Sequence, residues 1–220
     1  MNRLKPLFPQ IADAQWNLLE EMAALHREWN AKVNLVSRKD MQNLECHHYA
    51  PCIAATHFLK LMDGARIIDI GTGGGFPGLI LAALYPRAHF TLIDSVEKKV
   101  NAVRNIALRM KLRNVETLNL RVETLKCTYD FATGRAVTSL AQFIQWARPR
   151  LRRGAKHSLE NGVLYWKGGK LDADTESVGI EPTTVFSLEK TLDDPHFSEK
   201  YILHYRTQEL SRSKLPESTP

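Results

Sequence analysis

A glycine-rich turn between an expected strand and an expected helix constrains the fold of this chain more than any other feature. Residues 69–78 read DIGTGGGFPG; they follow the apolar run 66–70 and lead into the apolar stretch 78–85. Glycine adopts left-handed backbone angles and lets a ligand approach the main chain closely. Pro77 fits the first turn of a helix, where its missing N–H is no loss. The pattern predicts a ligand site at the end of a buried strand in an α/β domain.

An acidic residue closes the next expected strand. Asp94 follows the apolar run 89–93 and lies 19 residues after Gly75. A carboxylate at this place can accept hydrogen bonds from both ribose hydroxyls of an adenosine-containing ligand. The glycine turn and Asp94 together predict a bound adenosine cofactor, and a glycine-rich turn without a ligand is the alternative.

The glycines of this turn satisfy two cofactor patterns. Gly73, Gly75 and Gly78 fit GxGxxG, the dinucleotide pattern, which would indicate an NAD-linked oxidoreductase. Asp69 and Gly71, with Gly73 and Gly75, also spell DxGxGxG. That spelling resembles motif I of class I S-adenosylmethionine-dependent methyltransferases, in which the acid faces the methionine end of the cofactor. A dinucleotide site normally has an apolar residue in place of Asp69, because a carboxylate repels a pyrophosphate. Asp69 therefore favours S-adenosylmethionine over NAD.

Expected strands and helices alternate through most of the chain. Further strands are expected at 115–120, 129–133 and 163–166, and further helices at 95–113 and 138–151. This alternation predicts an α/β fold with a doubly wound, mostly parallel sheet, like that of class I methyltransferases. Later runs at 183–188 and 201–205 suit two closing strands, for which an antiparallel arrangement is open.

Two helical segments precede the first expected strand. Apolar residues recur at helical spacing over 13–30, with Asp13 as the expected N-cap. A second helix is expected over 40–61, ended or kinked by Pro51. We therefore expect an N-terminal helical extension, residues 1–62, followed by the cofactor-binding α/β domain, residues 63–210. The short polar tail, residues 211–220, is expected to be disordered.

The positive charge of the chain is regional. Its 30 Lys and Arg residues against 24 Asp and Glu residues give a net charge of +6. Residues 141–170 carry seven basic side chains against one acidic, and residues 96–126 carry eight against three, so the remainder is acidic. Such stretches suit a nucleic-acid partner where they lie beside the binding site, and a solvated helix face otherwise. The arginines within 148–153 have no role that the sequence assigns.

Several partners and settings are disfavoured. No apolar run approaches the ~20 residues of a membrane span, and the start MNRLKPLFPQ lacks the apolar core of a secretory signal. Three cysteines without a CxxC pattern argue against a disulfide framework and a cysteine zinc site. His47 and His48 are adjacent on an expected helix and should not share one face, so no metal site is expected. These features predict a cytoplasmic protein without a membrane or metal partner.

A series of short motifs resembles one family. The chain is similar to the bacterial small-subunit ribosomal RNA guanine-N7 methyltransferases, also called the glucose-inhibited division protein B family, from about Trp29 to Tyr205. The matching pieces, in order, are WNAKVNLVSR at 29–38, His48, GTGGGFPG at 71–78, LIDS at 92–95 with Lys98 and Lys99, RVE at 121–123, GRA at 134–136 and KG at 167–168. Each piece alone is modest, but their order and spacing are specific.

The resemblance implies a cofactor, a partner and a set of roles. The cofactor is S-adenosylmethionine, and the partner is small-subunit ribosomal RNA, alone or within a ribosomal particle. The implied cofactor-binding residues are Gly71, Gly73, Gly75 and Phe76 in the turn, Asp94 at the ribose, Val122 and Glu123 at the adenine, and Arg135 at the methionine end. The implied RNA-binding residues are Arg121, Arg135, Lys167 and Lys200, of which Arg135 and Lys167 would also act in catalysis by position and charge.

The chain departs from the family pattern at four places. His47 replaces an arginine, Pro51-Cys52 replaces Asp-Ser, Gly74 replaces a proline, and Lys200 replaces an arginine. A lysine does not reproduce a bidentate arginine contact. The departures leave the cofactor motifs intact and fall on implied RNA contacts, so an altered target preference is an open alternative.

The implied chemistry needs no general base. Guanine N7 carries a lone pair and no proton, so methyl transfer requires in-line placement and dipoles suited to charge moving onto the base. An exocyclic-amine methyltransferase should show [DN]-P-P-[YF] after the fourth strand, where this chain reads TGRA. A C5-pyrimidine enzyme needs a cysteine nucleophile; Cys52 lies before the glycine turn and is interpreted as a helix-packing thiol. A non-catalytic RNA-binding module on the same fold is the remaining alternative.

The tryptophans receive structural interpretations. Trp16, Trp29 and Trp146 are expected to pack in the core, whereas Trp166, beside Lys167, is open to a role at the target base. Because N7 lies in the deep groove of A-form RNA, the target guanine must be in a loop or splayed out.

Overall fold

Seven strands form one sheet in the computed structural model, which describes residues 1–213 and 215. The strands are β1 (Arg66–Ile70), β2 (His89–Asp94), β3 (Val115–Asn119), β4 (Phe131–Arg135), β5 (Gly162–Gly168), β6 (Thr184–Ser187) and β7 (Lys200–Arg206). Their order is β3-β2-β1-β4-β5-β7-β6. Strand β7 pairs antiparallel with both β5 and β6, and the other pairings are parallel. The expected doubly wound, mostly parallel sheet is confirmed.

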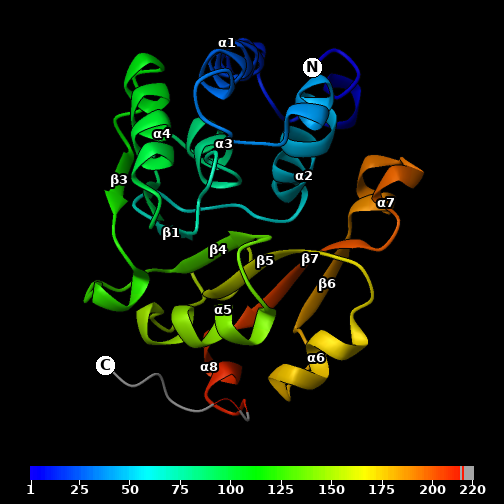
Figure 1. Cartoon of the computed structure of the whole chain (residues 1–220). Helices are drawn as coiled ribbons and strands as arrows, with labels where there is room; N and C mark the ends of the chain where they lie inside the picture. Colours follow the sequence, from blue (N-terminus) through cyan, green and yellow to red (C-terminus); the bar gives the residue numbers. More distant parts are fainter. Residues whose placement is uncertain (214, 216–220) are drawn as a thin grey trace.

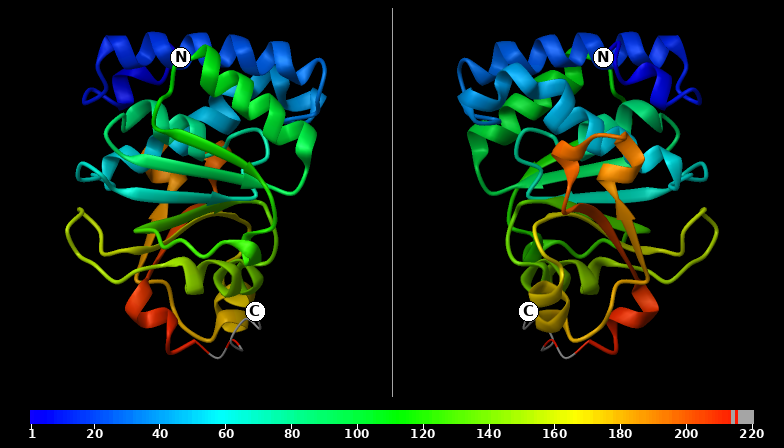
Figure 2. Two further views of the ribbon diagram at one scale, coloured as in Figure 1. Left: turned by 90° about the vertical axis from the view of Figure 1, so that its left-hand side faces the viewer. Right: turned by 90° about the vertical axis from the view of Figure 1, so that its right-hand side faces the viewer.

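Helices cover both faces of this sheet (Figure 1). The α-helices are α1 (Asp13–Asn30), α2 (Ala50–Ile53), α3 (Gly78–Leu84), α4 (Glu97–Arg109), α5 (Leu140–Ala147), α6 (Asp172–Val178), α7 (Leu188–Leu192) and α8 (Thr207–Leu210). Figures 1 and 2 place α1 to α4 on one face and α5, α6 and α8 on the other, and α1 packs on α3 and α4 as an outer layer. The N-terminal helical extension is therefore part of the fold.

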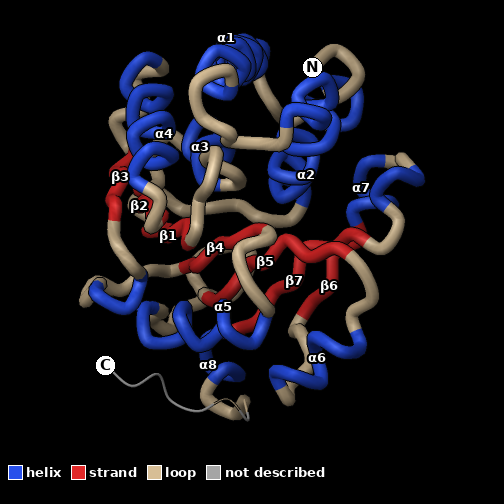
Figure 3. Tube along the Cα trace, viewed as in Figure 1, coloured by secondary structure: helices blue, strands red, loops and turns tan. Residues whose placement is uncertain are grey.

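The hydrophobic core divides at the sheet. Ile67 and Phe90 belong to the cluster beneath α1 to α4, and Ile68 and Ile93 belong to the cluster above α5. Alternation along each strand produces this division, because successive side chains point to opposite faces. Residues of the N-terminal extension, including Phe8, share the first cluster with the sheet. The red strands between two blue helical layers in Figure 3 show this arrangement.

The expected second helix is a chain of short helical pieces. Residues 38–57 form the 3-10 helix η2 (Arg38–Asn43), the π-helix η3 (Leu44–Tyr49), α2, and the 3-10 helix η4 (Ala54–His57). The interpretation of 40–61 as one helix was wrong. Pro51 lies within the first turn of α2, where a missing N–H costs little. The first helix is confirmed over Asp13–Asn30, but its N-cap is Ala12 and not Asp13.

The later elements differ in detail from the sequence prediction. Strand β4 begins two residues after its predicted start, because Tyr129 makes only an isolated bridge with Leu151 before regular pairing starts at Phe131. The antiparallel closing strands are confirmed, and α6, α7 and α8 were not predicted. Residue 214 and residues 216–220 of the expected disordered tail lie outside the described residues.

Two arginines of the run 148–153 form hydrogen bonds that stabilise the fold. Arg150 is buried and donates to the carbonyl of Glu123 at 2.6 Å. Arg152 donates through Nε and Nη2 to both carboxylate oxygens of buried Asp130, each at 2.8 Å. Paired guanidinium–carboxylate contacts of this kind fix geometry strongly. These two arginines have structural partners, and Arg150 also supports the loop that contains Glu123.

Within the described part of the chain, no helix has the length and apolarity required to cross a membrane.

Candidate active site

A cavity of about 490 Å³ opens at the carboxyl ends of β1, β2 and β4. The chain leaves β1, builds β2 and β3 on one side, and returns to β4 on the other, so β1 and β4 form the switch point of the sheet. Ligands of open α/β sheets bind at such a point. Residues from the N-terminal extension, the glycine turn and the ends of β2 and β4 line this cavity, among them Leu35, Val36, His48, Gly71, Gly73, Phe76, Asp94, Arg121, Val122, Glu123, Arg135 and Val137.

Most of the expected cofactor-binding residues meet at this cavity. The glycine turn, Asp94, the Val122–Glu123 pair and Arg135 come from four separate segments and all line it. Gly75 does not. Its φ is +91°, and a Cβ there would lie 2.5 Å from Leu79 Cδ1, so Gly75 allows the turn to pack against α3.

Asp94 connects the glycine turn to the start of α4. One carboxylate oxygen accepts a hydrogen bond from the Gly73 N–H at 2.9 Å, and the other accepts from the Val96 N–H at 2.8 Å. The side chain is partly exposed at the end of β2 and faces the cavity. Each oxygen retains acceptor capacity, because an ionised carboxylate offers about four lone-pair positions.

Asp69 does not line the cavity. It is fully buried, and its carboxylate accepts hydrogen bonds from the Thr72 hydroxyl at 2.6 Å, the Thr133 hydroxyl at 2.8 Å and the Gly78 N–H at 3.1 Å. Burial raises the pKa of Asp69 to about 6. Its carboxylate therefore has no direct contact with the cavity, and the expectation that this acid faces the methionine end of the cofactor stays a prediction. Asp69 ties the glycine turn to α3 and β4.

A second cavity, of about 350 Å³, adjoins the first. Arg135 and Ala136 line both cavities. The second also contains Asp40, His47, Pro51, Trp166, Lys167, Leu188, His196, Phe197 and Lys200. The expected RNA-binding residues therefore divide: Arg121 lines the first cavity, Lys167 and Lys200 line the second, and Arg135 stands between them.

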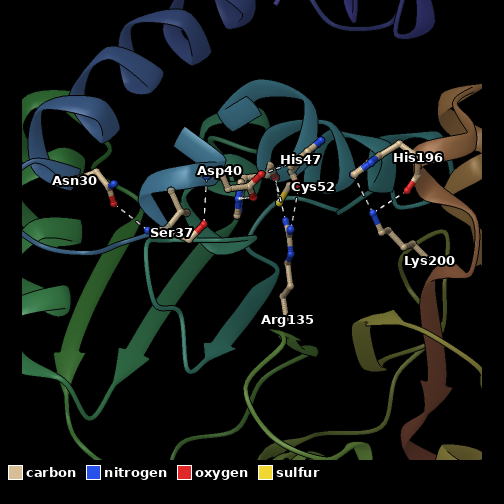
Figure 4. A network of polar contacts seen from close by, with 10 residues as sticks. Asn30, Ser37, Asp40, His47, Cys52, Arg135, His196 and Lys200 are labelled. Carbon is tan, nitrogen blue, oxygen red and sulfur yellow. Dashed lines mark hydrogen bonds and ion pairs between the residues drawn. The ribbon is translucent and has the colours of Figure 1, made fainter. Parts of the chain in front are cut away.

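Arg135 joins the end of β4 to the N-terminal extension. Its guanidinium donates to the carbonyl of His47 at 2.7 Å and to the carbonyl of His48 at 3.3 Å. Figure 4 shows the side chain pointing from β4 toward this helical segment. The cation at the junction of the two cavities is therefore fixed by two backbone carbonyls.

His47 and His48 meet at one carboxylate. Asp40 accepts from His47 Nδ1 at 2.5 Å and from His48 Nε2 at 2.6 Å. Asp40 lies between the two rings, and each of its carboxylate oxygens accepts from one of them, a shared contact that the sequence did not predict. Within the described residues, no group of three or more His, Cys, Asp or Glu side chains is arranged to hold a metal ion.

Cys52 and Trp166 have partners in the interior. Cys52 is fully buried, donates to the carbonyl of His48 at 3.0 Å, and burial raises its pKa to about 12, which agrees with a packing thiol. Trp166 is buried and donates from Nε1 to the carbonyl of Pro51 at 2.7 Å. It forms part of the wall of the second cavity. Trp16 is buried as expected, whereas Trp146 lines the first cavity.

His26 supports the glycine turn from α1 and was not predicted as a site residue. Its Nε2 lies 2.8 Å from the carbonyl of Gly74, and its Nδ1 lies 2.7 Å from the Tyr49 hydroxyl. The ring stacks on Phe76 with centroids 4.8 Å apart. Nδ1 also lies 3.1 Å from the carbonyl of Met22. In the neutral ring, a proton on Nε2 serves the shorter carbonyl contact, to Gly74, and leaves Nδ1 to accept from the Tyr49 hydroxyl. A histidine at position 26 is not among the apolar residues from which the helix was predicted, so no sequence signal indicated this contact.

Asn30 was quoted only as part of a motif, and the structure explains its place there. Its buried side-chain oxygen accepts from the backbone N–H groups of Leu35 and Val36 at 2.8 and 2.9 Å. Leu35 and Val36 both line the first cavity. The extension therefore supplies one wall of the site, positioned by Asn30.

Replacing His26 with glutamine should change the pH dependence of stability. Burial lowers the pKa of His26 to about 4 from an ordinary 6.5. Between pH 6.5 and pH 4, His26 is therefore protonated in the unfolded chain but neutral in the folded chain. The stabilisation of the fold by neutral His26 is fully present above pH 6.5. It is lost as the pH falls toward 4, and the loss is on the order of 3 kcal/mol. Glutamine can donate to Gly74 and accept from Tyr49 without titrating.

Urea unfolding at pH 7.5 and pH 5 measures this difference. We expect wild type to lose more stability than His26→Gln over that interval, since every other titrating group is common to both proteins. Equal losses in the two proteins would contradict a buried neutral His26.

Comparisons with known proteins identify the family of this chain. A family model described as GidB: rRNA small subunit methyltransferase G matches residues 15–178. The Ribosomal RNA small subunit methyltransferase G of Flavobacterium johnsoniae is 34% identical over 204 residues, covering 93% of this chain and 97% of the relative. The protein of the same name from Parabacteroides distasonis is 36% identical over 199 residues, covering 90% and 84%.

A solved structure of the fibrillarin/NOP5p complex is similar in fold. It has a TM-score of 0.53 at 13% sequence identity, and the match covers 71% of this chain and 80% of the other. This likeness extends to the fold alone, whereas the family match and the two relatives extend to sequence over most of the chain. On these grounds the chain belongs to the GidB family, rRNA small subunit methyltransferase G, and is an S-adenosylmethionine-dependent methyltransferase.

Proposed function

We propose that this enzyme methylates N7 of a guanine in small-subunit ribosomal RNA. The observation that carries the proposal is the pair of adjoining cavities that share Arg135 and Ala136. The first suits the methyl donor and the second suits a base that has left its stack. A reaction between a cofactor and a large polymer needs two compartments that meet where the transferred group passes.

The residues around the first cavity fit S-adenosylmethionine. Gly71 and Gly73 leave the main chain open to a ligand, and Asp94 offers acceptors suited to the ribose hydroxyls. Val122 and Glu123 would lie at the adenine, Phe76 would pack against the cofactor, and Arg135 would lie at its methionine end. When bound, the cofactor supplies an electrophilic methyl group. The chain's own residues hold it and keep the two cavities aligned.

Direct transfer to N7 suits the second cavity. N7 has a lone pair and no proton, so the site needs orientation and charge rather than a base. Both oxygens of Asp40 are already engaged by His47 and His48, which favours a positioning role for this group. Arg135 and Lys167 would then act through position and charge.

Basic residues of both cavities would bind the RNA backbone. Arg121 is exposed beside the first cavity, and Lys167 and Lys200 are half-buried beside the second. Phosphate contacts of this kind position a nucleic acid without reading its sequence. We propose that the substrate is the RNA within a ribosomal particle in the cytoplasm, with residues 1–62 forming one wall of the site and residues 63–210 holding the cofactor.

Methyl mapping tests this function. The protein is incubated with labelled S-adenosylmethionine and small ribosomal subunits that lack the modification, and the RNA is analysed by mass spectrometry. We expect one methyl group on N7 of one guanine. Label on another atom or on no RNA would contradict the proposal, and salt-dependent RNA binding without label would favour a non-catalytic binding module. Thermal stabilisation by S-adenosylhomocysteine but not by NADH is the matching ligand control, since family membership leaves the NAD alternative without support.

A further inference from the structure

Two of the four departures from the family pattern converge on one residue. His47 and Lys200 are far apart in the sequence, and each contacts His196. The His47 and His196 rings are parallel within 4°, with centroids 3.9 Å apart. Lys200 Nζ lies 2.9 Å from His196 Nε2 and 2.8 Å from the His196 carbonyl. The substitutions are therefore linked in space, and we refer to the two rings as the histidine stack.

Each ring of the histidine stack is oriented by a charged neighbour. Asp40 accepts from His47 Nδ1 and so fixes that ring in its plane. The Lys200 ammonium can only donate, so His196 Nε2 accepts, and its proton resides on Nδ1. Figure 4 shows His196 and Lys200 on one side of the site and His47 with Asp40 on the other. The stack spans the gap between the N-terminal extension and the segment before β7.

The two rings differ in freedom. His47 is half-buried in η3, whereas His196 is exposed on η7 (Pro195–Phe197), a three-residue turn. His196 can therefore move away from His47 with little loss of core packing. Both rings line the second cavity. The other tryptophan or phenylalanine faces there, Trp166 and Phe197, are buried, and the Trp166 indole is tied to Pro51.

We propose that the histidine stack is the stacking platform for the target purine, with the His196 ring moving outward so that the base inserts between the two rings and packs face to face against both. This inference rests on the proposed function and names the residues that would bind the target base. Bases removed from a helix are commonly held by stacking on aromatic side chains, histidine included. In the free protein the two imidazole rings cover one face of each other from solvent. A purine between them would replace this ring contact with contacts of larger area.

Two substitutions of His196 separate stacking from other roles. His196→Ala removes the ring, and His196→Phe keeps a flat face while removing the nitrogen that Lys200 contacts. Base stacking of this kind supports a KM increase of about 10-fold for the ribosomal subunit in His196→Ala. We expect His196→Phe to stay within about threefold of wild type, and the Kd for S-adenosylmethionine to be unchanged in both. His89→Ala, an exposed histidine at the start of β2, is the matched control.

The outcomes are distinct. Equal KM increases in His196→Ala and His196→Phe would overturn stacking and leave the ring as a strut for Lys200. An unchanged KM in His196→Ala would also overturn it.

A second measurement does not depend on methyl transfer. Guanosine 5′-monophosphate is titrated into the protein saturated with S-adenosylhomocysteine, and the histidine ring signals are followed by NMR. Stacking predicts upfield shifts of the His47 and His196 ring protons, with the His47 shift reduced in His196→Ala. Absence of these shifts would contradict the platform even if the enzyme methylates its RNA. Their presence in a protein that labels no RNA would retain the platform and reject the proposed reaction.

Discussion

Gly71→Val should abolish useful binding of S-adenosylmethionine, with an increase in Kd of about 100-fold or more. Gly71 has a φ of +67°, and a Cβ there would lie 2.4 Å from Val137 Cγ1 and 3.2 Å from Val137 Cβ. A β-branched residue in this left-handed region costs on the order of 1–2 kcal/mol, and forced overpacking adds about 1–3 kcal/mol. Both Gly71 and Val137 line the first cavity, so a shift of the glycine turn or of the Val137 side chain would change the shape of that cavity. Isothermal calorimetry measures the effect.

Gly64→Val separates backbone strain from closure of the cavity. Gly64 has a similar φ of +75°, a Cβ there would meet nothing within 4 Å, and the residue does not line the first cavity. The control should lower Tm and leave the Kd for S-adenosylmethionine unchanged. A Gly71→Val protein that bound the cofactor within threefold of wild type would refute the assignment of the first cavity.

Arg135→Ala should reduce kcat/KM for the RNA substrate about 100-fold, which corresponds to about 2.7 kcal/mol. The substitution removes the cation shared by the two cavities and leaves the carbonyls of His47 and His48 without their guanidinium partner. The His48 carbonyl still accepts from the Cys52 thiol, so the main loss falls on the His47 carbonyl. A hydrogen bond to a charged donor contributes about 1.5–3 kcal/mol. The π-helix η3 would then shift, and its residues His47 and His48 would move relative to the two cavities. Single-turnover methyl transfer, with cofactor affinity measured in parallel, tests this.

Arg135→Lys should give an intermediate rate, because an ammonium can reach one carbonyl but lacks the planar fork of a guanidinium. Arg87→Ala is the matched control: Arg87 is exposed, pairs with Asp63, and lies before β2 at the opposite end of the sheet. If Arg135→Ala retained the rate within threefold, the shared cation would have no part in transfer.

The lining of the first cavity could largely be predicted because its sequence signals are local. Gly71, Gly73 and Asp94 belong to short segments in which a strand, a turn and a helix follow one another. Parallel strands place their carboxyl ends at one edge, so consecutive segments must meet there. The same reasoning placed Arg135 at the end of β4, although the boundary of that strand was two residues early. The hydrogen bonds of Asp69 to Thr72, Thr133 and Gly78 could not be predicted, because spacing identifies a residue but not the direction of its side chain.

The base side of the site could not be predicted in the same way. Asp40, His47 and His196 come from irregular helical pieces whose sequences have no clear period. His26 is a buried polar residue of α1, and hydrophobic periodicity does not identify buried polar residues. Its contact with Gly74 spans 48 residues of sequence. Such contacts depend on how α1 packs over the sheet.

The sequence by itself determined the alternation of strands and helices from β1 to β5, the glycine turn, the acid after β2 and the resemblance to a methyltransferase family. These features follow from short-range backbone preferences and from strand alternation, which act within a few residues. Only the tertiary structure decided that Arg135 bridges two cavities, that Asp40 receives both histidines and that His47 and Lys200 meet at His196. The physical reason is that these contacts join the N-terminal extension to the ends of β4 and β7, and their geometry arises only when the helices close over the sheet.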